Sequence, residues 1–345
     1  MKIQVNARNH AHYFATDPGE NILYGGLSKS IDLPYECGSG TCGTCKARLI
    51  SGELVDHWPE APGRKYIKSS DEFLMCQCSA VTDAVLEVPA FVHPIEVGAC
   101  TPDFLGGRIQ TVSALTHDVM AISIELWEPV DFDAGQFYLV QVPGVEGFRA
   151  WSMVNYQRHA TTLDFVIKKK PGGALSDWLF SASREGIEVE VFGPLGKATF
   201  HPDLGQNLLC IAGGSGIAGM MSILSRAAQC LYFTRYAGDV FFGVRSAKDA
   251  FYLDEFAYLC SQFPQTLHIT VAMSEEEAPA SVVADYPQLR FEKGFVHEVA
   301  GRSMQGRYAD VRAYLAGPPP AVDASIRMLL QARVATNNIR YDKFS

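Results

Sequence analysis

The first third of the sequence carries cysteines whose spacing could bind metal. Residues 36–45 read ECGSGTCGTC, so Cys37, Cys42 and Cys45 follow a C-x4-C-x2-C pattern, and Cys76 stands apart in the segment FLMCQC. Thiolates at this spacing bind the two irons of a [2Fe–2S] cluster, and intervening glycines let backbone amides approach the bridging sulfides. A structural zinc site also uses four thiolates, but it usually pairs them in two short C-x2-4-C units. The spacing therefore favours an iron–sulfur cluster.

The fourth ligand is ambiguous, because Cys78 lies two residues after Cys76. Two such residues on a strand point to the same face, so alternation does not separate them. The remaining cysteines occur singly, in apolar or interdomain contexts, and we expect them to be small core residues rather than reactive groups; they are Cys100, Cys210, Cys230 and Cys260.

A second chemical signal is the segment GGSGIAG, which follows the apolar run Leu208–Ala212. It contains G-x-G-x-x-G at Gly214, Gly216 and Gly219, between an expected strand and an expected helix, where such a loop binds phosphate. A dinucleotide fold usually has an acidic residue at the end of the next strand. Here that strand ends in Arg245, which could pair with a 2′-phosphate or stack on adenine. The loop alone predicts a phosphate-binding turn.

The middle of the chain offers two further segments. One is the tetrapeptide Arg149-Ala-Trp-Ser152, and the other is FVIKKKPGGALS at 165–176, which reads as a strand, a glycine turn and a helix starting at Leu175. A flavin needs positive charge and backbone donors at its pyrophosphate, and a helix amino end supplies such donors. The two segments offer these features, although the three lysines could also form a solvated turn.

The elements that must position these residues fall into three pieces. Residues 1–97 alternate apolar and polar residues in short strands, at Lys2–Arg8, Lys46–Ile50 and Val85–Val88. Residues 98–203 repeat strand signals at short spacing, typical of an antiparallel β-barrel. Residues 204–345 alternate strands and helices, which predicts an α/β domain with a parallel sheet. The barrel strands are expected at 107–112, 119–127, 135–142, 162–168 and 187–192; the strands of the last piece at 208–212, 240–244, 267–273 and 313–316; and its helices at 217–229, 252–262 and 321–334.

Charge and composition exclude several classes of protein. The chain of 345 residues has 29 basic and 38 acidic side chains, a net charge of −9, and nucleic-acid or anionic-membrane binding usually needs clustered Lys and Arg. The amino end shows no secretory signal. The uncharged stretch Leu204–Ser225 is long enough to span a membrane, but its glycines indicate a strand, a turn and a helix start. An odd number of cysteines, nine, argues against a complete disulfide framework, so we expect a cytoplasmic protein.

The segments PYECGSGTCGTCK, WPEAPG and FLMCQC resemble the ferredoxin domain of reductase components of bacterial multicomponent oxygenases, especially those of toluene and related diiron monooxygenases. The resemblance covers essentially the whole chain. It implies a β-grasp [2Fe–2S] ferredoxin domain (1–97), an FAD-binding barrel (98–203) and an NAD(P)H-binding domain (204–345) similar to ferredoxin–NADP reductase. It also selects Cys76 as the fourth ligand, because an apolar residue precedes the ligand in such domains.

The resemblance assigns roles at the flavin. Arg149-Ala-Trp-Ser152 is similar to the R-x-Y-S signature, in which Arg149 would contact the pyrophosphate, Trp151 would stack on the isoalloxazine ring and Ser152 would hydrogen-bond near N5. Gly173 and Ser176 resemble the G-x-x-S element, and Ile167 and Lys168 are assigned to the same site. Phe344, in the terminal segment RYDKFS, would lie near the flavin ring; the alternative is a plain terminal strand.

The nucleotide loop is similar to the family's G-G-[ST]-G-[IL]-A-P segment, which assigns nicotinamide cofactor binding to Gly213, Gly214, Ser215 and Gly216. Ala316-Gly317-Pro318 resembles a C-G-P segment, so Gly317 and Pro318 join this site, with Arg245. Gly219 replaces the usual proline and should loosen the loop, and Ala316 replaces the usual cysteine. NADH is expected over NADPH from the resemblance alone.

The resemblance implies an NADH-dependent oxidoreductase that passes electrons from NADH through FAD and the cluster to a diiron monooxygenase, directly or through a Rieske ferredoxin. Two alternatives remain: the reductase of a Rieske ring-hydroxylating dioxygenase, and a redox sensor that uses only the cluster. A monomer is expected, because transient docking needs exposed faces.

Overall fold

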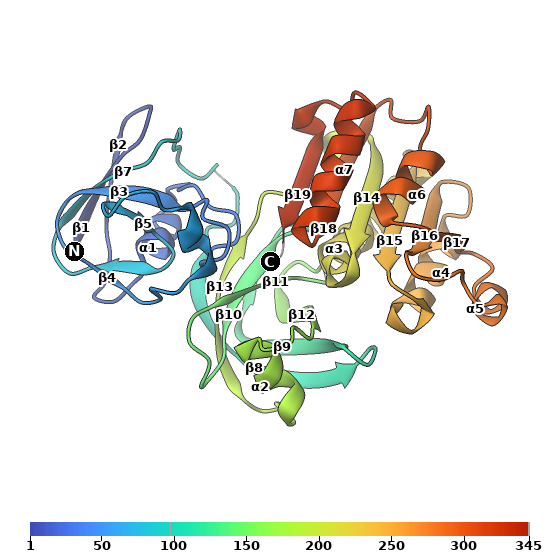
Figure 1. The fold of residues 1–345 in the computed structure, drawn as a ribbon, viewed down its shortest axis with the longest axis horizontal. Coiled ribbons are helices and arrows are strands. Elements are labelled where there is room, and N and C mark those ends of the chain that lie inside the picture. Colours follow the sequence, from blue (N-terminus) through green and yellow to red (C-terminus); the bar gives the residue numbers. More distant parts are fainter. Residues whose placement is uncertain (97, 344–345) are drawn as a thin grey trace.

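The computed structural model describes residues 1–96 and 98–343, whose strands form three separate main sheets (Figure 1). In the amino-terminal domain, a mixed five-stranded sheet has the order β2-β1-β7-β3-β5. Alternation along β1 buries Ile3 and Val5, and β1 pairs with β7 in parallel. The elements are β1 (Lys2–Asn6), β2 (Ala11–Ala15), α1 (Ile22–Ser28), β3 (Lys46–Ser51), β4 (Leu54–Asp56), the 3-10 turn η1 (Pro62–Tyr66), β5 (Glu72–Leu74), β6 (Cys78–Ala80) and β7 (Ala84–Glu87). The predicted α+β ferredoxin fold is confirmed.

The middle domain is the predicted antiparallel barrel, with the strand order β11-β10-β13-β8-β9-β12. An isolated bridge between Met153 and Phe165 joins the two edge strands and closes the sheet. Its elements are β8 (Asp103–Ala114), β9 (Val119–Val130), β10 (Phe137–Gln141), β11 (Arg149–Ser152), β12 (Ala160–Lys168), α2 (Ala174–Ser181) and β13 (Glu188–Leu195). The helix α2 begins one residue earlier than predicted.

The carboxy-terminal domain is an all-parallel sheet with the order β17-β16-β15-β14-β18-β19, as the alternation of strands and helices predicted. Helices α3 and α7 both pack against β18. The uncharged stretch 204–225 forms β14, a glycine turn and the start of α3. The elements are β14 (Asn207–Gly213), α3 (Ile217–Gln229), β15 (Gly238–Val244), α4 (Leu253–Gln262), β16 (Leu267–Met273), α5 (Ala280–Asp285), β17 (Arg290–Lys293), α6 (Val296–Ser303), β18 (Val311–Gly317), α7 (Pro319–Gln331) and β19 (Ile339–Lys343).

The barrel lies between the other two domains (Figure 1). An apolar joint connects it with the amino-terminal domain: the ring of Tyr24 on α1 lies 4.7 Å from that of Phe192 on β13 and 5.6 Å from that of Phe148. An ion pair of 2.7 Å between Lys197 and Asp32 lies at the same boundary. The joint fixes the cysteine loop against the barrel. Within the described residues, no helix has the length and apolar composition needed to cross a membrane.

Candidate functional site

The cysteine loop lies between α1 and β3, and its glycines turn it back on itself. Gly38, Gly40 and Gly43 have φ angles of +64°, +84° and +77°, a region that favours glycine. The loop is pinned from outside, because the Tyr24 hydroxyl donates a hydrogen bond of 2.8 Å to the Gly38 carbonyl. These constraints bring backbone N–H groups towards the sulfur atoms.

The amides of Ser39, Thr41 and Cys42 each lie 3.4 Å from the Cys37 sulfur, and the Thr44 amide lies 3.4 Å from the Cys42 sulfur. Donors at this distance favour a thiolate. The hydrogen bond from the Cys42 thiol, helped by the surrounding amides, lowers the pKa of Cys37 to about 4. Because thiolate is the form that binds iron, the loop fits the predicted cluster.

The structure separates the two candidates for fourth ligand. The Cys76 sulfur is buried and lies 3.2 Å from the sulfur of Cys45, and Gln77 donates to it at 3.4 Å. Cys78 begins β6, where it pairs with Asp56, and burial raises the pKa of its thiol to about 12. The geometry therefore supports Cys76. Of the other four cysteines, Cys210 and Cys260 are buried in the carboxy-terminal core.

Four of the predicted flavin residues, Trp151, Ser152, Ile167 and Lys168, meet at a cavity of about 150 Å³ between the barrel and α3. Its walls come from β11, β12 and the glycine loop of the carboxy-terminal domain, and they include Ala150, Trp151, Ser152, Val166, Ile167, Lys168, Ser215 and Ala218. The Ser152 hydroxyl is buried with no hydrogen-bond partner among the described residues. Since buried polar atoms are normally paired, this orphan fits a polar ring atom of a bound flavin.

Three predicted flavin residues lie elsewhere. Arg149 points to the amino-terminal domain, with its guanidinium 5.0 Å from the centre of the Trp58 ring, and burial lowers its pKa. The Ser176 hydroxyl donates to the carbonyls of Lys170 and Gly173, at 2.7 and 3.0 Å. It therefore stabilises its own turn, and neither Ser176 nor Gly173 is among the described residues that line the cavity. Phe344 lies outside the described residues.

The predicted nicotinamide residues gather around a cavity of about 410 Å³ at the carboxyl ends of β14, β15 and β18. The cavity wall includes all of the assigned residues. The other residues come from the ends of β12 and β15, from the loops after β15, β16 and β17, and from the starts of α6 and α7. The full wall contains Lys168, Gly213, Gly214, Ser215, Gly216, Gly243, Val244, Arg245, Asp249, Phe251, Ser274, Gly294, Phe295, Val296, Gly317, Pro318 and Ala321. Ligands of open α/β sheets bind in this position.

Gly216 makes the closest backbone approach in this loop. A Cβ atom at Gly216 would lie 2.7 Å from the Ala316 carbonyl atoms, so only glycine lets the loop lie against the end of β18. Gly219 falls in the first turn of α3, where an added Cβ would lie 3.7 Å from the Ser152 side chain. The residue predicted to loosen the loop thus lies inside a helix beside the flavin cavity.

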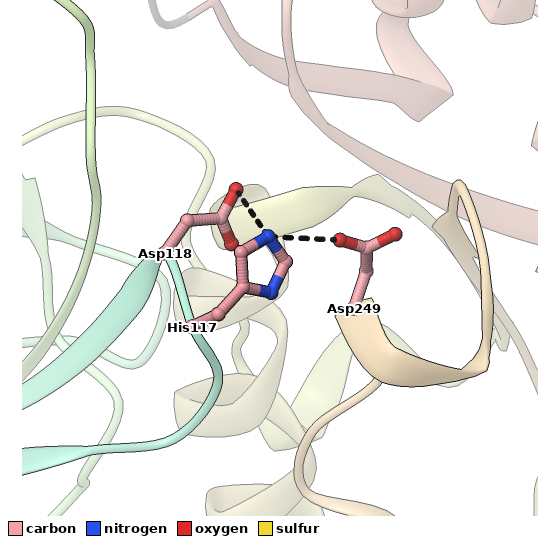
Figure 2. Close-up of side chains that lie close together, drawn as sticks. All are labelled: His117, Asp118 and Asp249. Carbon is pink, nitrogen blue, oxygen red and sulfur yellow. Dashed lines mark ion pairs between the residues drawn. The ribbon is translucent and has the colours of Figure 1, made fainter.

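Arg245 is held by carboxylates from two domains. Its Nη2 atom lies 3.0 Å from Asp249 and 3.3 Å from Asp118, which belongs to the turn between β8 and β9 of the barrel. Figure 2 shows the two carboxylates beside His117, whose Nε2 atom lies 3.8 Å from Asp118 and 3.9 Å from Asp249. Asp118 also pairs with Lys168 at 3.2 Å. His117, Asp118 and Asp249 could be read as metal ligands, but the two carboxylates are already paired with two cations. Asp118 could not be found from the sequence, because 127 residues separate it from Arg245.

The three sites are contiguous. Lys168 and Ser215 line both the nucleotide cavity and the flavin cavity. Ala150 lines the flavin cavity and also a smaller one of about 20 Å³, whose wall includes the cluster residue Cys37. Each pair of neighbouring sites thus shares a wall, with the flavin cavity in the middle. A hydride donor can therefore reach the flavin from one side and an electron can leave towards the cluster on the other.

Comparison with known protein families agrees with this division. Residues 5–81 match the model of a 2Fe-2S iron-sulfur cluster binding domain, residues 107–200 match that of an oxidoreductase FAD-binding domain, and residues 210–326 match that of an oxidoreductase NAD-binding domain. The protein is therefore an oxidoreductase with these three cofactors: a [2Fe–2S] cluster, FAD and a nicotinamide nucleotide.

Relatives match over nearly their full length. The ferredoxin–NAD(P)+ reductase CarAd of Metapseudomonas resinovorans is 33% identical over 94% of this chain and 95% of its own, and the reductase component DmpP of phenol 2-monooxygenase from Pseudomonas sp. (strain CF600) is 28% identical over 100% and 95%. The solved ferredoxin reductase of carbazole 1,9a-dioxygenase superposes with a TM-score of 0.83 at 30% identity, covering 100% of this chain and 99% of its own. The chain belongs to the family of ferredoxin–NAD(P)+ reductases that are components of oxygenase systems.

Proposed function

We propose that the protein oxidises NADH and delivers the electrons singly, through FAD and the [2Fe–2S] cluster, to a diiron monooxygenase component, either directly or through a Rieske ferredoxin. The observation that carries this proposal is the contiguity of the nucleotide cavity, the flavin cavity and the cysteine loop. A redox sensor would need only the cysteine loop, and it would leave the other two cavities without a role.

When bound, FAD accepts a hydride and releases single electrons, which the cluster carries onward. The chain's own residues position and shield these groups. The unpartnered Ser152 hydroxyl would hydrogen-bond the flavin ring, and buried Trp151 would exclude water from the barrel side of its cavity. Cys37, Cys42, Cys45 and Cys76 would ligate the irons, with amides from the loop directed at the sulfurs. We assign Arg149, Gly173 and Ser176 to the more distant part of FAD.

The Cys42→Ser variant tests the order of the carriers. Flavin reduction by NADH should persist in this variant, because Cys42 does not line the nucleotide or flavin cavity. Onward transfer to a partner should be lost, because the cluster lacks one thiolate. Anaerobic stopped-flow absorbance follows both steps. Electron delivery at the normal rate by a folded Cys42→Ser protein would contradict the proposal.

The similarity to the carbazole dioxygenase reductase supports a second candidate, the reductase of a Rieske dioxygenase. The two candidates differ in the acceptor. Reduction of a purified diiron hydroxylase, compared with that of a Rieske oxygenase at equal concentration, distinguishes them. We further infer a cytoplasmic location, because all nine cysteines are unpaired and a reducing compartment keeps them so. We infer a monomer, because transient docking of a partner needs exposed faces.

A further inference from the structure

Arg245 occupies the position that distinguishes the two nicotinamide nucleotides. It directly follows β15, the strand next to β14 and its glycine loop. In dinucleotide-binding sheets, an acidic residue at this point accepts the ribose 2′-hydroxyl of NADH, whereas an arginine accommodates the 2′-phosphate of NADPH. By residue type alone, Arg245 would suit NADPH.

The surroundings of Arg245 change this expectation. Asp249 lies 3.0 Å from its guanidinium and is itself fixed, because the Ser246 amide and hydroxyl donate to Asp249 at 3.0 and 2.7 Å. The Asp249 side chain is only 3% exposed. Burial alone would raise the pKa of Asp249, but the hydrogen bonds from Ser246 and Arg245 lower it, so Asp249 remains a carboxylate.

The second carboxylate comes from another domain. Asp118 reaches from the barrel to within 3.3 Å of Arg245 and 3.2 Å of Lys168. Arg245, Lys168 and Asp249 all line the nucleotide cavity. The two cations of the cavity wall are thus neutralised by two carboxylates, and a 2′-phosphate, with about 1.5 to 2 negative charges, would have to compete with both.

We propose that Asp118, a residue of the flavin barrel, determines the preference of this protein for NADH over NADPH. It does so by forming an ion pair with Arg245 of the nucleotide domain, which leaves the arginine unavailable to a 2′-phosphate. A neutral 2′-hydroxyl fits beside the paired arginine and can donate to a carboxylate, but a 2′-phosphate meets like charge. This inference rests on the proposed oxidation of NADH.

The test is the Asp118→Asn variant of the full-length holoprotein, assayed for flavin reduction by NADH and by NADPH and for equilibrium binding of NAD+ and NADP+. The ratio of kcat/KM for NADPH to that for NADH should rise about five- to tenfold, mainly through KM, and NADP+ should bind correspondingly tighter. The double variant Asp118→Asn with Arg245→Gln should lose this gain. Asp131→Asn is the matched control, since Asp131 is a barrel carboxylate paired with His159 outside the nucleotide cavity.

An unchanged ratio in folded Asp118→Asn protein would overturn the inference. A rise that persists in the double variant would also overturn it, because Arg245 would not be the released cation. Failure of NADH to reduce the flavin of the unsubstituted protein would instead contradict the proposed function. The two failures are therefore distinguishable.

Discussion

At the scale of single residues, the proposed flavin reduction depends on a buried hydroxyl that has no hydrogen-bond partner in the described part of the protein. Ser152 is buried, lines the flavin cavity and has no partner for its hydroxyl among the described residues, and Ser222 on α3 is a second buried serine in the same condition. Only Ser152 lines the flavin cavity. Substituting each serine in turn therefore distinguishes a role at the flavin from a role in packing.

We predict that Ser152→Ala slows flavin reduction by NADH about ten- to a hundredfold, because a hydrogen bond to a buried polar group contributes about 1–3 kcal/mol. Ser222→Ala should leave the rate unchanged. Both variants should keep their melting temperature, since each removes an unpaired buried hydroxyl. Rapid-mixing absorbance and thermal unfolding measure the two effects; equal slowing in both variants would remove Ser152 from the flavin site.

Residue types and spacing predicted three of the cluster ligands but not the fourth. Cys76 and Cys78 are equivalent by alternation, and they differ only because the chain turns between β5 and β6 and brings Cys76 to Cys45. Similarly, the sequence gives no indication that Arg149 contacts Trp58. Such pairings depend on how two domains meet, which no local pattern encodes.

At the scale of elements, predicted and observed bounds agree best for the elements that are most deeply buried. The predicted bounds of α3 and β16 match the structure, because most of their residues are apolar and buried. Six strands that no pattern predicted have three to five residues, and each lies at the edge of its sheet; they are β2, β4, β5, β6, β11 and β17. Short edge strands have weak alternation, and pairing with a neighbour decides their formation.

The glycine loop before α3 yields an element-scale prediction. Gly216→Ala should lower the free energy of unfolding by about 1–3 kcal/mol and weaken NAD+ binding, because the new methyl group would overlap the backbone at the end of β18. Gly213→Ala is the control for stability in the same loop, although Gly213 also lines the nucleotide cavity. Its Cβ would meet nothing closer than 3.4 Å, at Pro318, and its φ of −111° suits alanine.

Thermal unfolding and NAD+ titration of both variants check this expectation. Gly216→Ala protein with normal stability and affinity would show that the contact between the loop and β18 is not tight.

At the scale of the whole molecule, the joint between the amino-terminal domain and the barrel holds the cluster loop in place. Its core is aromatic, and its rim includes the stacking of Arg149 on Trp58 at 5.0 Å. The core of the amino-terminal domain continues through this joint to barrel residues that include Phe137, Leu139, Phe192 and Leu195. The proposed electron route therefore crosses a packed domain boundary.

We predict that Arg149→Met and Trp58→Leu each lower the midpoint of thermal unfolding, and that the double variant lowers it no further than the larger single effect. A cation–π contact of this kind contributes about 0.5–2 kcal/mol, which both single variants remove. Additive losses would mean that the two side chains act independently. The FAD content of each protein adds a second readout: loss of FAD in Arg149→Met alone supports contact of Arg149 with the pyrophosphate.

The edge strand β19 closes the boundary between the domains. Tyr341 and Asp342 line the same small cavity as Glu36 and Cys37, and the Tyr341 hydroxyl lies 3.5 Å from Glu36, 305 residues away along the chain. The cysteine loop is synthesised before β19. The amino-terminal domain can therefore fold before this wall of the proposed electron path exists. The path is complete only once β19 has joined its sheet.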